Sequence, residues 1–194
     1  MVFSNQIPVF EYNLRITPPN PVYSQIVNLK SEFIRYFGPG LYSKSSPHIT
    51  IASFCMDPQH EPKLLGSLQN NLTDQNFKIR LHQVSGFDNI GMVVIDVAHN
   101  RILNDQMTRL QKALKYEIKL PSKYFSVVDR FHITIGRAAD SLDYRKAILL
   151  LNTLSYDHEF TTTEFVLMRR PFGQQTAWQP CYKFQLNQQI AEVA

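Results

Sequence analysis

Alternating polar and apolar residues along the chain predict short strands, and apolar residues spaced three or four apart predict helices between them. The expected helices occupy about 22–37, 62–72, 100–118 and 141–154. The expected strands occupy about 9–17, 47–54, 77–84, 92–97, 131–137, 161–168 and 181–186. Breakers such as Gly38-Pro39-Gly40 and Pro121 separate these elements. The pattern therefore predicts a mixed protein in which strands and helices interleave.

Two of the expected strands carry the same pattern, His-Ile-Thr-Ile, at 48–51 and again at 132–135. Successive side chains of a strand point to opposite faces, so each histidine shares a face with the threonine of its own copy. The isoleucines take the other face, where they can pack on helices. A single copy is ordinary for a strand, but two copies in the same frame indicate a shared chemical task. The candidate catalytic residues are His48, Thr50, His132 and Thr134.

The two halves of the chain, about 1–90 and 91–194, repeat the order strand, helix, motif strand, helix, strand. Two similar lobes related by an approximate two-fold axis would bring equivalent strands together at a central cleft. We therefore expect one bilobal domain over 1–194, with the two histidine–threonine faces opposed across that cleft. The order of elements alone also allows a parallel α/β sheet.

Two histidines and two threonines without a fixed carboxylate or cysteine partner suit the cleavage of a phosphodiester. One imidazole can accept a proton from the nucleophile while the other, protonated, donates one to the leaving oxygen. The threonine hydroxyls can donate hydrogen bonds to the negatively charged oxygens of the transition state. We expect no metal or other cofactor, because an imidazolium supplies the positive charge. A metal-dependent hydrolase is disfavoured because the remaining histidines lack zinc-ligand spacing: His60, His82, His99 and His158.

With its two H-x-T-x motifs, the chain resembles the 2H phosphoesterase superfamily, in particular the 2′-5′ RNA ligase-like (LigT-like) cyclic phosphodiesterases. The resemblance covers most of the chain and extends to Phe54 and Arg137, which follow the motifs. It implies an α+β fold of two lobes, with two antiparallel sheets and helices outside. It also implies hydrolysis of 2′,3′-cyclic phosphates or 2′-5′ linkages at RNA or nucleotide ends. In that family the first histidine commonly donates the proton and the second accepts it, which implies these roles for His48 and His132, although near-symmetry makes them exchangeable.

The candidates for substrate binding are aromatic or basic residues: Tyr42, Phe54, Tyr124, Arg137 and Tyr182. Tyr42 and Tyr124 lie in the loops before the motifs, and the second loop also carries basic residues that can neutralise phosphate. A solvated basic loop with anchoring aromatic residues is the competing interpretation. Arg137 matches an arginine often found in the family, but strand parity puts it on the isoleucine side unless the strand bends. Tyr182 resembles an aromatic residue of the family's last strand and is equally compatible with a core position.

Composition adds modest constraints. The chain has 194 residues, 44% of them hydrophobic, and a net charge of +4, which favours anionic partners such as RNA ends or cyclic nucleotides. Its two cysteines, and the lack of a signal peptide or long apolar segment, lead us to expect a cytoplasmic protein with no membrane and no obligate protein partner. The alternative function is a nucleotide- or RNA-end-binding module with little turnover. The two intact histidines argue against it, because binding alone does not need both an acid and a base.

Overall fold

The computed structural model describes residues 10–40, 42–128, 130–153 and 156–187. Its strands are β1 (Phe10–Ile16), β2 (Ile49–Met56), β3 (Phe77–Phe87), β4 (Met92–Val97), β5 (Phe125–Val127), β6 (His132–Arg137), β7 (Asp157–Thr162), β8 (Glu164–Pro171) and β9 (Gln179–Gln185). They form one sheet in the order β7-β3-β4-β6-β2-β1-β8-β9, with β5 pairing with β2 off this path. Every pairing between these strands is antiparallel, which confirms the α+β prediction and excludes the parallel α/β alternative.

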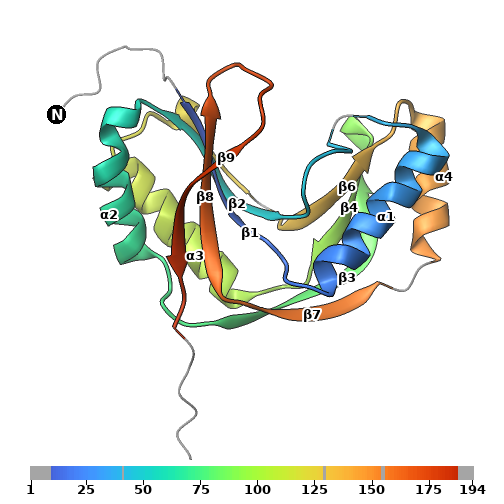
Figure 1. The fold of residues 1–194 in the computed structure, drawn as a ribbon, viewed down its shortest axis with the longest axis horizontal. Coiled ribbons are helices and arrows are strands. Elements are labelled where there is room, and N and C mark those ends of the chain that lie inside the picture. The colour runs from blue at the N-terminus through green and yellow to red at the C-terminus, as the bar shows by residue number, and fades with distance from the viewer. Residues whose placement is uncertain (1–9, 41, 129, 154–155, 188–194) are drawn as a thin grey trace, which may run out of the picture.

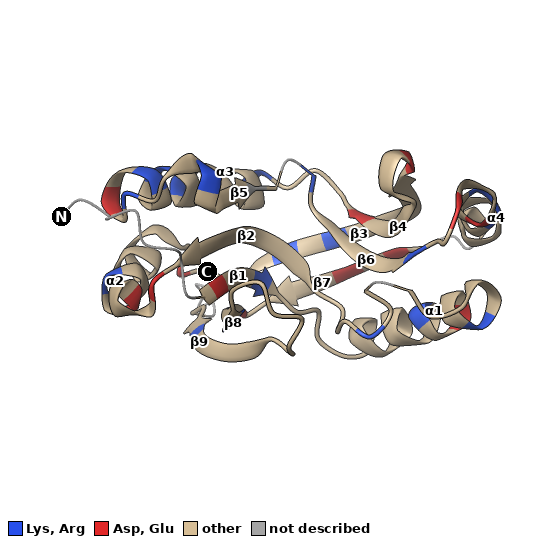
Figure 2. Ribbon diagram, turned by 90° about the horizontal axis from the view of Figure 1, so that it is seen from above, with Lys and Arg blue, Asp and Glu red and all other residues tan. Residues whose placement is uncertain are grey.

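The helices lie outside the sheet, in two pairs at opposite ends of the molecule (Figure 1, and from above in Figure 2). The longer ones are α1 (Val22–Phe37), α2 (Glu61–Asn71), α3 (Arg101–Lys112) and α4 (Ser141–Asn152). A π-helical turn at Ala113–Glu117 extends α3, and 3-10 turns lie at Pro58–His60, Asp88–Ile90 and Ser122–Tyr124. As the sequence predicts, Asn100 caps α3, because its side chain accepts a hydrogen bond from the amide of Leu103 at 3.1 Å. None of the helices in the described ranges is long and apolar enough to cross a membrane.

Each lobe takes elements from both halves of the sequence. The lobe with the first motif holds β1, β2, β5, β8 and β9 with α2 and α3, and the lobe with the second motif holds β3, β4, β6 and β7 with α1 and α4 (Figure 1). The first helix of each half therefore crosses over, since α1 contacts β6 and α3 contacts β2. The two expected sheets are continuous with each other, because β2 and β6 pair at Ile49 and Ile133.

One expected strand, 161–168, is two strands in the structure. The chain leaves β7 and enters β8 at Thr163, and in doing so passes from one lobe to the other. β7 pairs with β3, whereas β8 pairs with β1. The residues at this crossing, Thr161, Thr162 and Thr163, are β-branched and include no Gly or Pro, so the pattern alone could not show that the pairing partner changes.

One extra residue in each motif strand changes the direction of the side chains that follow. The partners of β2 on β1 skip Ile51, and the partners of β6 on β4 skip Ile135. Each of these isoleucines forms a β-bulge at the fourth position of its motif, and the residues after a bulge have the opposite parity to that of a regular strand. All motif isoleucines are fully buried, as predicted: Ile49, Ile51, Ile133 and Ile135. The opposite face of the sheet, which carries the motif histidines and threonines, is called the motif face below.

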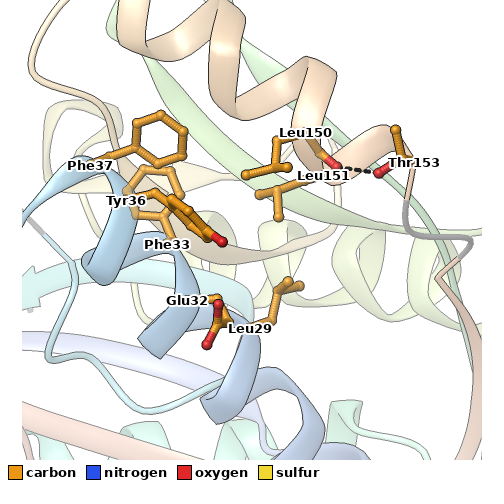
Figure 3. Close-up of a pocket in the computed structure, with 8 residues that line it drawn as sticks. All are labelled: Leu29, Glu32, Phe33, Tyr36, Phe37, Leu150, Leu151 and Thr153. Atoms are coloured by element: carbon orange, nitrogen blue, oxygen red, sulfur yellow. Dashed lines mark hydrogen bonds between the residues drawn. The ribbon is translucent and has the colours of Figure 1, made fainter.

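A pocket of about 230 Å³ lies between α1 and α4, on the outside of the second lobe (Figure 3). Apolar side chains make up most of its lining: Leu29, Glu32, Phe33, Tyr36, Phe37, Leu150, Leu151 and Thr153. Because none of these is a motif residue and Phe33 packs in the core beneath β6, the pocket is separate from the motif face.

Candidate active site

The two motifs lie side by side at the centre of the sheet. The isoleucines at their second positions pair with each other in antiparallel register. This register places His48 level with Thr134, and Thr50 level with His132, all on the motif face. The four side chains thus come from adjacent strands, although they are far apart in the sequence.

The two histidine rings are anchored in the same way. Nδ1 of His48 lies 2.7 Å from the carbonyl oxygen of Ser46, and Nδ1 of His132 lies 2.8 Å from that of Arg130. A carbonyl oxygen can only accept, so Nδ1 carries the hydrogen in both rings. Proton exchange with a substrate therefore falls to Nε2 of each ring. Within the described ranges, no three side chains of His, Cys, Asp or Glu are grouped as a metal site would require.

His48 stands in a partly buried environment with a positive charge. The pKa of its imidazole is lowered to about 4, chiefly by burial. The nearby Arg15, Lys30 and His132 act in the same direction, whereas the hydrogen bond to Ser46 raises the pKa. In this environment the imidazole of His48 is neutral at neutral pH.

Asn13 of β1 orients Thr50 from the neighbouring strand. Its buried side-chain amide donates to Thr50 Oγ1 at 3.3 Å and to Ser53 Oγ at 3.0 Å. Since the threonine oxygen accepts in this contact, the hydroxyl hydrogen stays available for another acceptor. Thr134 of the second motif makes only a weak contact, from Oγ1 to the sulfur of Met92 at 3.8 Å. Both hydroxyls can therefore donate to a phosphate oxygen.

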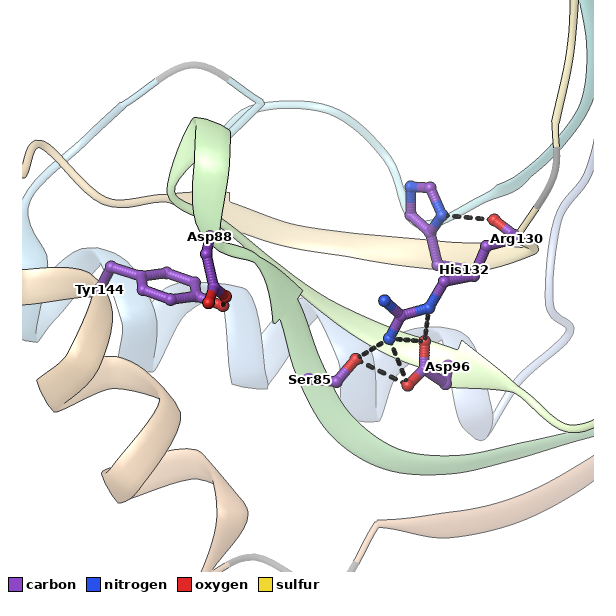
Figure 4. A network of polar contacts seen from close by, with 6 residues as sticks. All are labelled: Ser85, Asp88, Asp96, Arg130, His132 and Tyr144. Carbon is purple, nitrogen blue, oxygen red and sulfur yellow. Dashed lines mark hydrogen bonds and ion pairs between the residues drawn. The ribbon is translucent and has the colours of Figure 1, made fainter. Parts of the chain in front are cut away.

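An ion pair supports His132 (Figure 4). Arg130 donates to the carboxylate of Asp96 through Nε at 2.9 Å and through Nη2 at 2.8 Å, and Ser85 Oγ donates to it at 2.6 Å. Burial raises the pKa of Asp96, but the hydrogen bonds from Arg130 and Ser85 outweigh it and hold the pKa below its ordinary value. The ring of Phe87 lies 5.1 Å from the ring of His132 and 4.9 Å from the guanidinium of Arg130. Because the carbonyl of Arg130 binds the His132 ring, this network fixes the orientation of the imidazole.

Lys30 of α1 connects the two motif regions. Its side chain is buried, with the residue 4% exposed, and its ammonium donates to backbone carbonyls of Tyr42 at 2.9 Å and of Thr134 and Ile135 at 3.0 Å each. Burial lowers its pKa to about 8. A single ammonium group thus ties the loop that leads to the first motif to the bulge of the second.

The bulges decide where two predicted substrate-binding residues lie. Arg137 follows the bulge at Ile135, which returns it to the motif face, where it is exposed. The strand therefore bends at Ile135, which is the condition under which Arg137 can reach a phosphate on the motif face. Its role in substrate binding stays a prediction. Phe54 follows the bulge at Ile51, which turns its ring to the helix side, where it is 3% exposed and stacks on Tyr12 with ring centroids 5.3 Å apart. The prediction that Phe54 binds substrate is wrong, because its ring belongs to the core.

The predicted tyrosines also differ in position. Tyr42 is 53% exposed in the loop before the first motif, and the ring of Tyr124 lies 4.8 Å from the ammonium of Lys123. For both, substrate binding stays a prediction. Tyr182 pairs across the sheet with Leu167, which is fully buried on the helix side. Cross-strand partners share a face, so Tyr182 points away from the motifs and its prediction as a substrate-binding residue is wrong.

Several residues that surround the motifs are not among the residues that the sequence predicts for the site: Asn13, Arg15, Lys30, Ser85, Phe87 and Asp96. Two of them carried a signal. Lys30 interrupts the apolar stripe of its helix, and Asp96 interrupts the apolar run 92–97. A charged residue inside an otherwise apolar element is usually paired or functional. The other four depend on cross-strand register, which the pattern of a single strand does not show.

A continuous antiparallel sheet with two adjacent His-x-Thr motifs on one face defines a protein of the 2H phosphoesterase type. The profile of the 2′-5′ RNA ligase superfamily matches residues 18–173, and the chain belongs to this family. No curated protein matches the sequence.

Solved structures share the fold at low sequence identity. Escherichia coli LigT complexed with 3′-AMP has a TM-score of 0.66 and 18% identity, over 92% of this chain and 99% of that chain. The same protein complexed with ATP has a TM-score of 0.63 and 18% identity, over 94% and 100%. The protein TT0787 of Thermus thermophilus has a TM-score of 0.61 and 15% identity, over 92% and 99%. At such identities the likeness shows the fold.

Proposed function

We propose that the protein is a metal-independent phosphodiesterase that hydrolyses 2′,3′-cyclic phosphate or 2′-5′ linked ends of RNA or nucleotides, with His48 and His132 as acid and base. The observation that carries this proposal is the pairing of Ile49 with Ile133, which sets the two motifs side by side. Membership of a family of phosphoesterases and RNA ligase-like enzymes supports the type of reaction. The complex of E. coli LigT with 3′-AMP supports a nucleotide as ligand on this fold.

The proposed reaction moves two protons. His132 Nε2 accepts a proton from the attacking water, whose oxygen bonds to phosphorus, and His48 Nε2 donates a proton to the ester oxygen that leaves. Thr50 and Thr134 donate hydrogen bonds to the non-bridging oxygens, where negative charge accumulates. The products are a phosphomonoester and a free hydroxyl, and exchange with solvent restores both histidines.

The donor role of His48, which the family resemblance implies, requires its pKa to rise when substrate binds. Without a bound anion that pKa is about 4, so Nε2 of His48 carries no proton to donate at neutral pH. A phosphate anion on the motif face would offset the charges of Arg15 and Lys30, which now lower the pKa. Substrate binding is therefore expected to protonate His48 at the moment when the acid is needed.

The neutral state of His48 also favours a second candidate, a nucleotide- or RNA-end-binding module with little turnover. If phosphate binding fails to raise the pKa of His48, the site lacks a proton donor at neutral pH and holds its ligand without cleaving it. Binding and turnover must therefore be measured on the same ligands.

The test is a panel of 2′,3′-cyclic nucleotides, oligoribonucleotides with cyclic phosphate ends, and 2′-5′ dinucleotides, each assayed in the presence of EDTA. We expect turnover of at least one class by the wild-type protein and loss of that turnover in the double variant His48→Ala/His132→Ala. Tight binding without turnover of any substrate would support the binding module instead. Activity that chelation removes and a divalent ion restores would contradict the metal-independent mechanism.

A further inference from the structure

The partly buried arginines of this protein are paired with carboxylates, with one exception. Arg130, Arg169 and Arg170, whose side chains are 20 to 40% exposed, bind Asp96, Glu61 and Glu11 at 2.7, 2.5 and 2.5 Å. Arg15 is also partly buried, yet it forms no ion pair within the described ranges. Its Nε is buried and has no hydrogen-bond partner there. A buried guanidinium without a counter-charge is unfavourable unless something else supplies the negative charge.

Arg15 lies next to the proposed catalytic residues. It pairs with Thr50 across β1 and β2, so the two side chains share the motif face. Its charge acts on the imidazole of His48. Two residues earlier on the same face, Asn13 binds Thr50 and has a buried Oδ1 that is likewise without a partner in the part of the chain that the structure describes. Two of the unmatched polar atoms in the described structure, Arg15 Nε and Asn13 Oδ1, therefore lie beside the first motif.

We propose that Arg15 is a phosphate-binding residue of this site, and that its missing counter-charge is the phosphate of the substrate. The inference rests on the proposed function for the identity of the anion. A guanidinium offers parallel N–H donors that match two oxygens of one phosphate, as a lysine or histidine cannot. Arg15 would hold the phosphate from the side of β1, while Thr50 and Thr134 bind it from the adjacent strands.

The same contact connects phosphate binding to the state of His48. Arg15, Lys30 and His132 all act on this imidazole, and each of them lowers its pKa. Lys30 directs its ammonium at backbone carbonyls, so of the two cations that act on His48, Arg15 is the one whose Nε has no partner in the described structure. A bound phosphate would cancel part of the positive field and shift His48 toward its protonated form.

Calorimetric titration with inorganic phosphate tests the inference without any turnover. We expect Arg15→Met to weaken phosphate binding by about 10-fold or more, the scale of a lost charged hydrogen-bond pair, and Arg15→Lys to weaken it less. Removing an unpaired buried charge should leave the melting temperature equal or higher. The control Arg35→Met removes the same charge from an exposed ion pair on α1, and its affinity should stay within about 2-fold of wild type.

Unchanged phosphate affinity in Arg15→Met, or no measurable binding by the wild type, would overturn the inference. If Arg15→Met does not fold, Arg15→Lys decides: affinity at least about 3-fold weaker supports the inference, and equal affinity overturns it. A different result would contradict the proposed function alone: phosphate binds through Arg15, but none of the diesters is hydrolysed. Conversely, normal hydrolysis with unchanged KM in Arg15→Met would contradict the role of Arg15 and leave the proposed function standing.

Discussion

The two motif regions have the same backbone and different charges. In each, an isoleucine bulge follows the threonine, and the histidine Nδ1 donates to the carbonyl two residues earlier. Beside the second motif, Arg130 is neutralised by Asp96. Beside the first, Arg15 has no carboxylate partner in the described structure, and Lys30 adds a second cation.

This difference shows how near-identical motifs can take different roles. Burial, and to a smaller extent the positive surroundings, lower the pKa of His48 to about 4, and the positive charges make its proton affinity sensitive to a bound anion. The network around His132 instead fixes the ring through the carbonyl of Arg130. An acid and a base in one site need different environments, and the two proposed catalytic histidines have different neighbours. The fold repeats the geometry, and the neighbouring side chains give the two proposed catalytic histidines different surroundings.

Removing either histidine should have the largest effect on turnover, because the proposed mechanism needs both motifs. We expect His48→Ala and His132→Ala each to lower turnover by at least about 10²-fold, because each removes one proton transfer. Folding should change little, since both side chains are only partly buried. His99→Ala, at an exposed histidine, is the control and should keep normal turnover. A well-folded single variant with near-normal rates would refute the assignment.

Asp96→Asn should affect only the second motif region. It removes the negative charge that holds Arg130, so the His132 ring loses its fixed carbonyl, and turnover should fall by about 10-fold. The depressed pKa of Asp96 means that its contribution to stability is present above its ordinary value of 3.8 and is lost as the pH falls below it. The matched control is Glu11→Gln, which breaks the Arg170 ion pair away from the motifs. Equal turnover losses in the two variants would contradict a specific role for Asp96.

Lys30→Met should loosen the connection between the two regions and lower turnover by roughly 3- to 10-fold. Its clearest effect concerns stability. The folded-state pKa of Lys30 is about 8, below the ordinary 10.5, so the unfolded chain binds more protons between these values and wild-type stability rises across that window. Chemical denaturation at pH 8 and pH 10.5 should show this gain, at most roughly 3 kcal/mol, in the wild type but not in Lys30→Met. The same gain in both proteins would show that the Lys30 ammonium is not buried.

The smallest expected effect is on stability, and it differs between the two residues that directly follow the bulges. The position after Ile51 is Ala52, whereas the position after Ile135 is Gly136, where a Cβ would come within 2.5 Å of the Phe33 ring. Gly136→Ala should therefore destabilise the protein by about 1–3 kcal/mol through overpacking. Ala52→Gly, which creates no clash, should cost about 1 kcal/mol or less. Thermal unfolding of both variants compares them, and a harmless Gly136→Ala would mean that α1 packs less closely on β6 than the structure shows.

Local patterns predicted the elements and the motif face well. The alternation around His48 and His132 and the buried isoleucines are properties of single strands, so the sequence shows them. The bulges are not, because they depend on the partner strand. They turn Phe54 to the helix side and bring Arg137 to the motif face, neither of which regular alternation predicts. The packing of α1 and α3 on the opposite lobes likewise depends on tertiary contacts, which the pattern of a single helix does not show. Resemblance to a family supplied the antiparallel topology, which element order alone left open.

The pH dependence of turnover with EDTA present tests the central claim, that His48 and His132 act on one phosphodiester as acid and base. Wild-type kcat for a 2′,3′-cyclic nucleotide, which reports the substrate complex, should follow a bell-shaped curve, because one imidazole must be neutral while the other is protonated. The residual activity of His132→Ala should lose the acidic limb, and that of His48→Ala the alkaline limb. A profile with both limbs intact in either single variant would contradict the account.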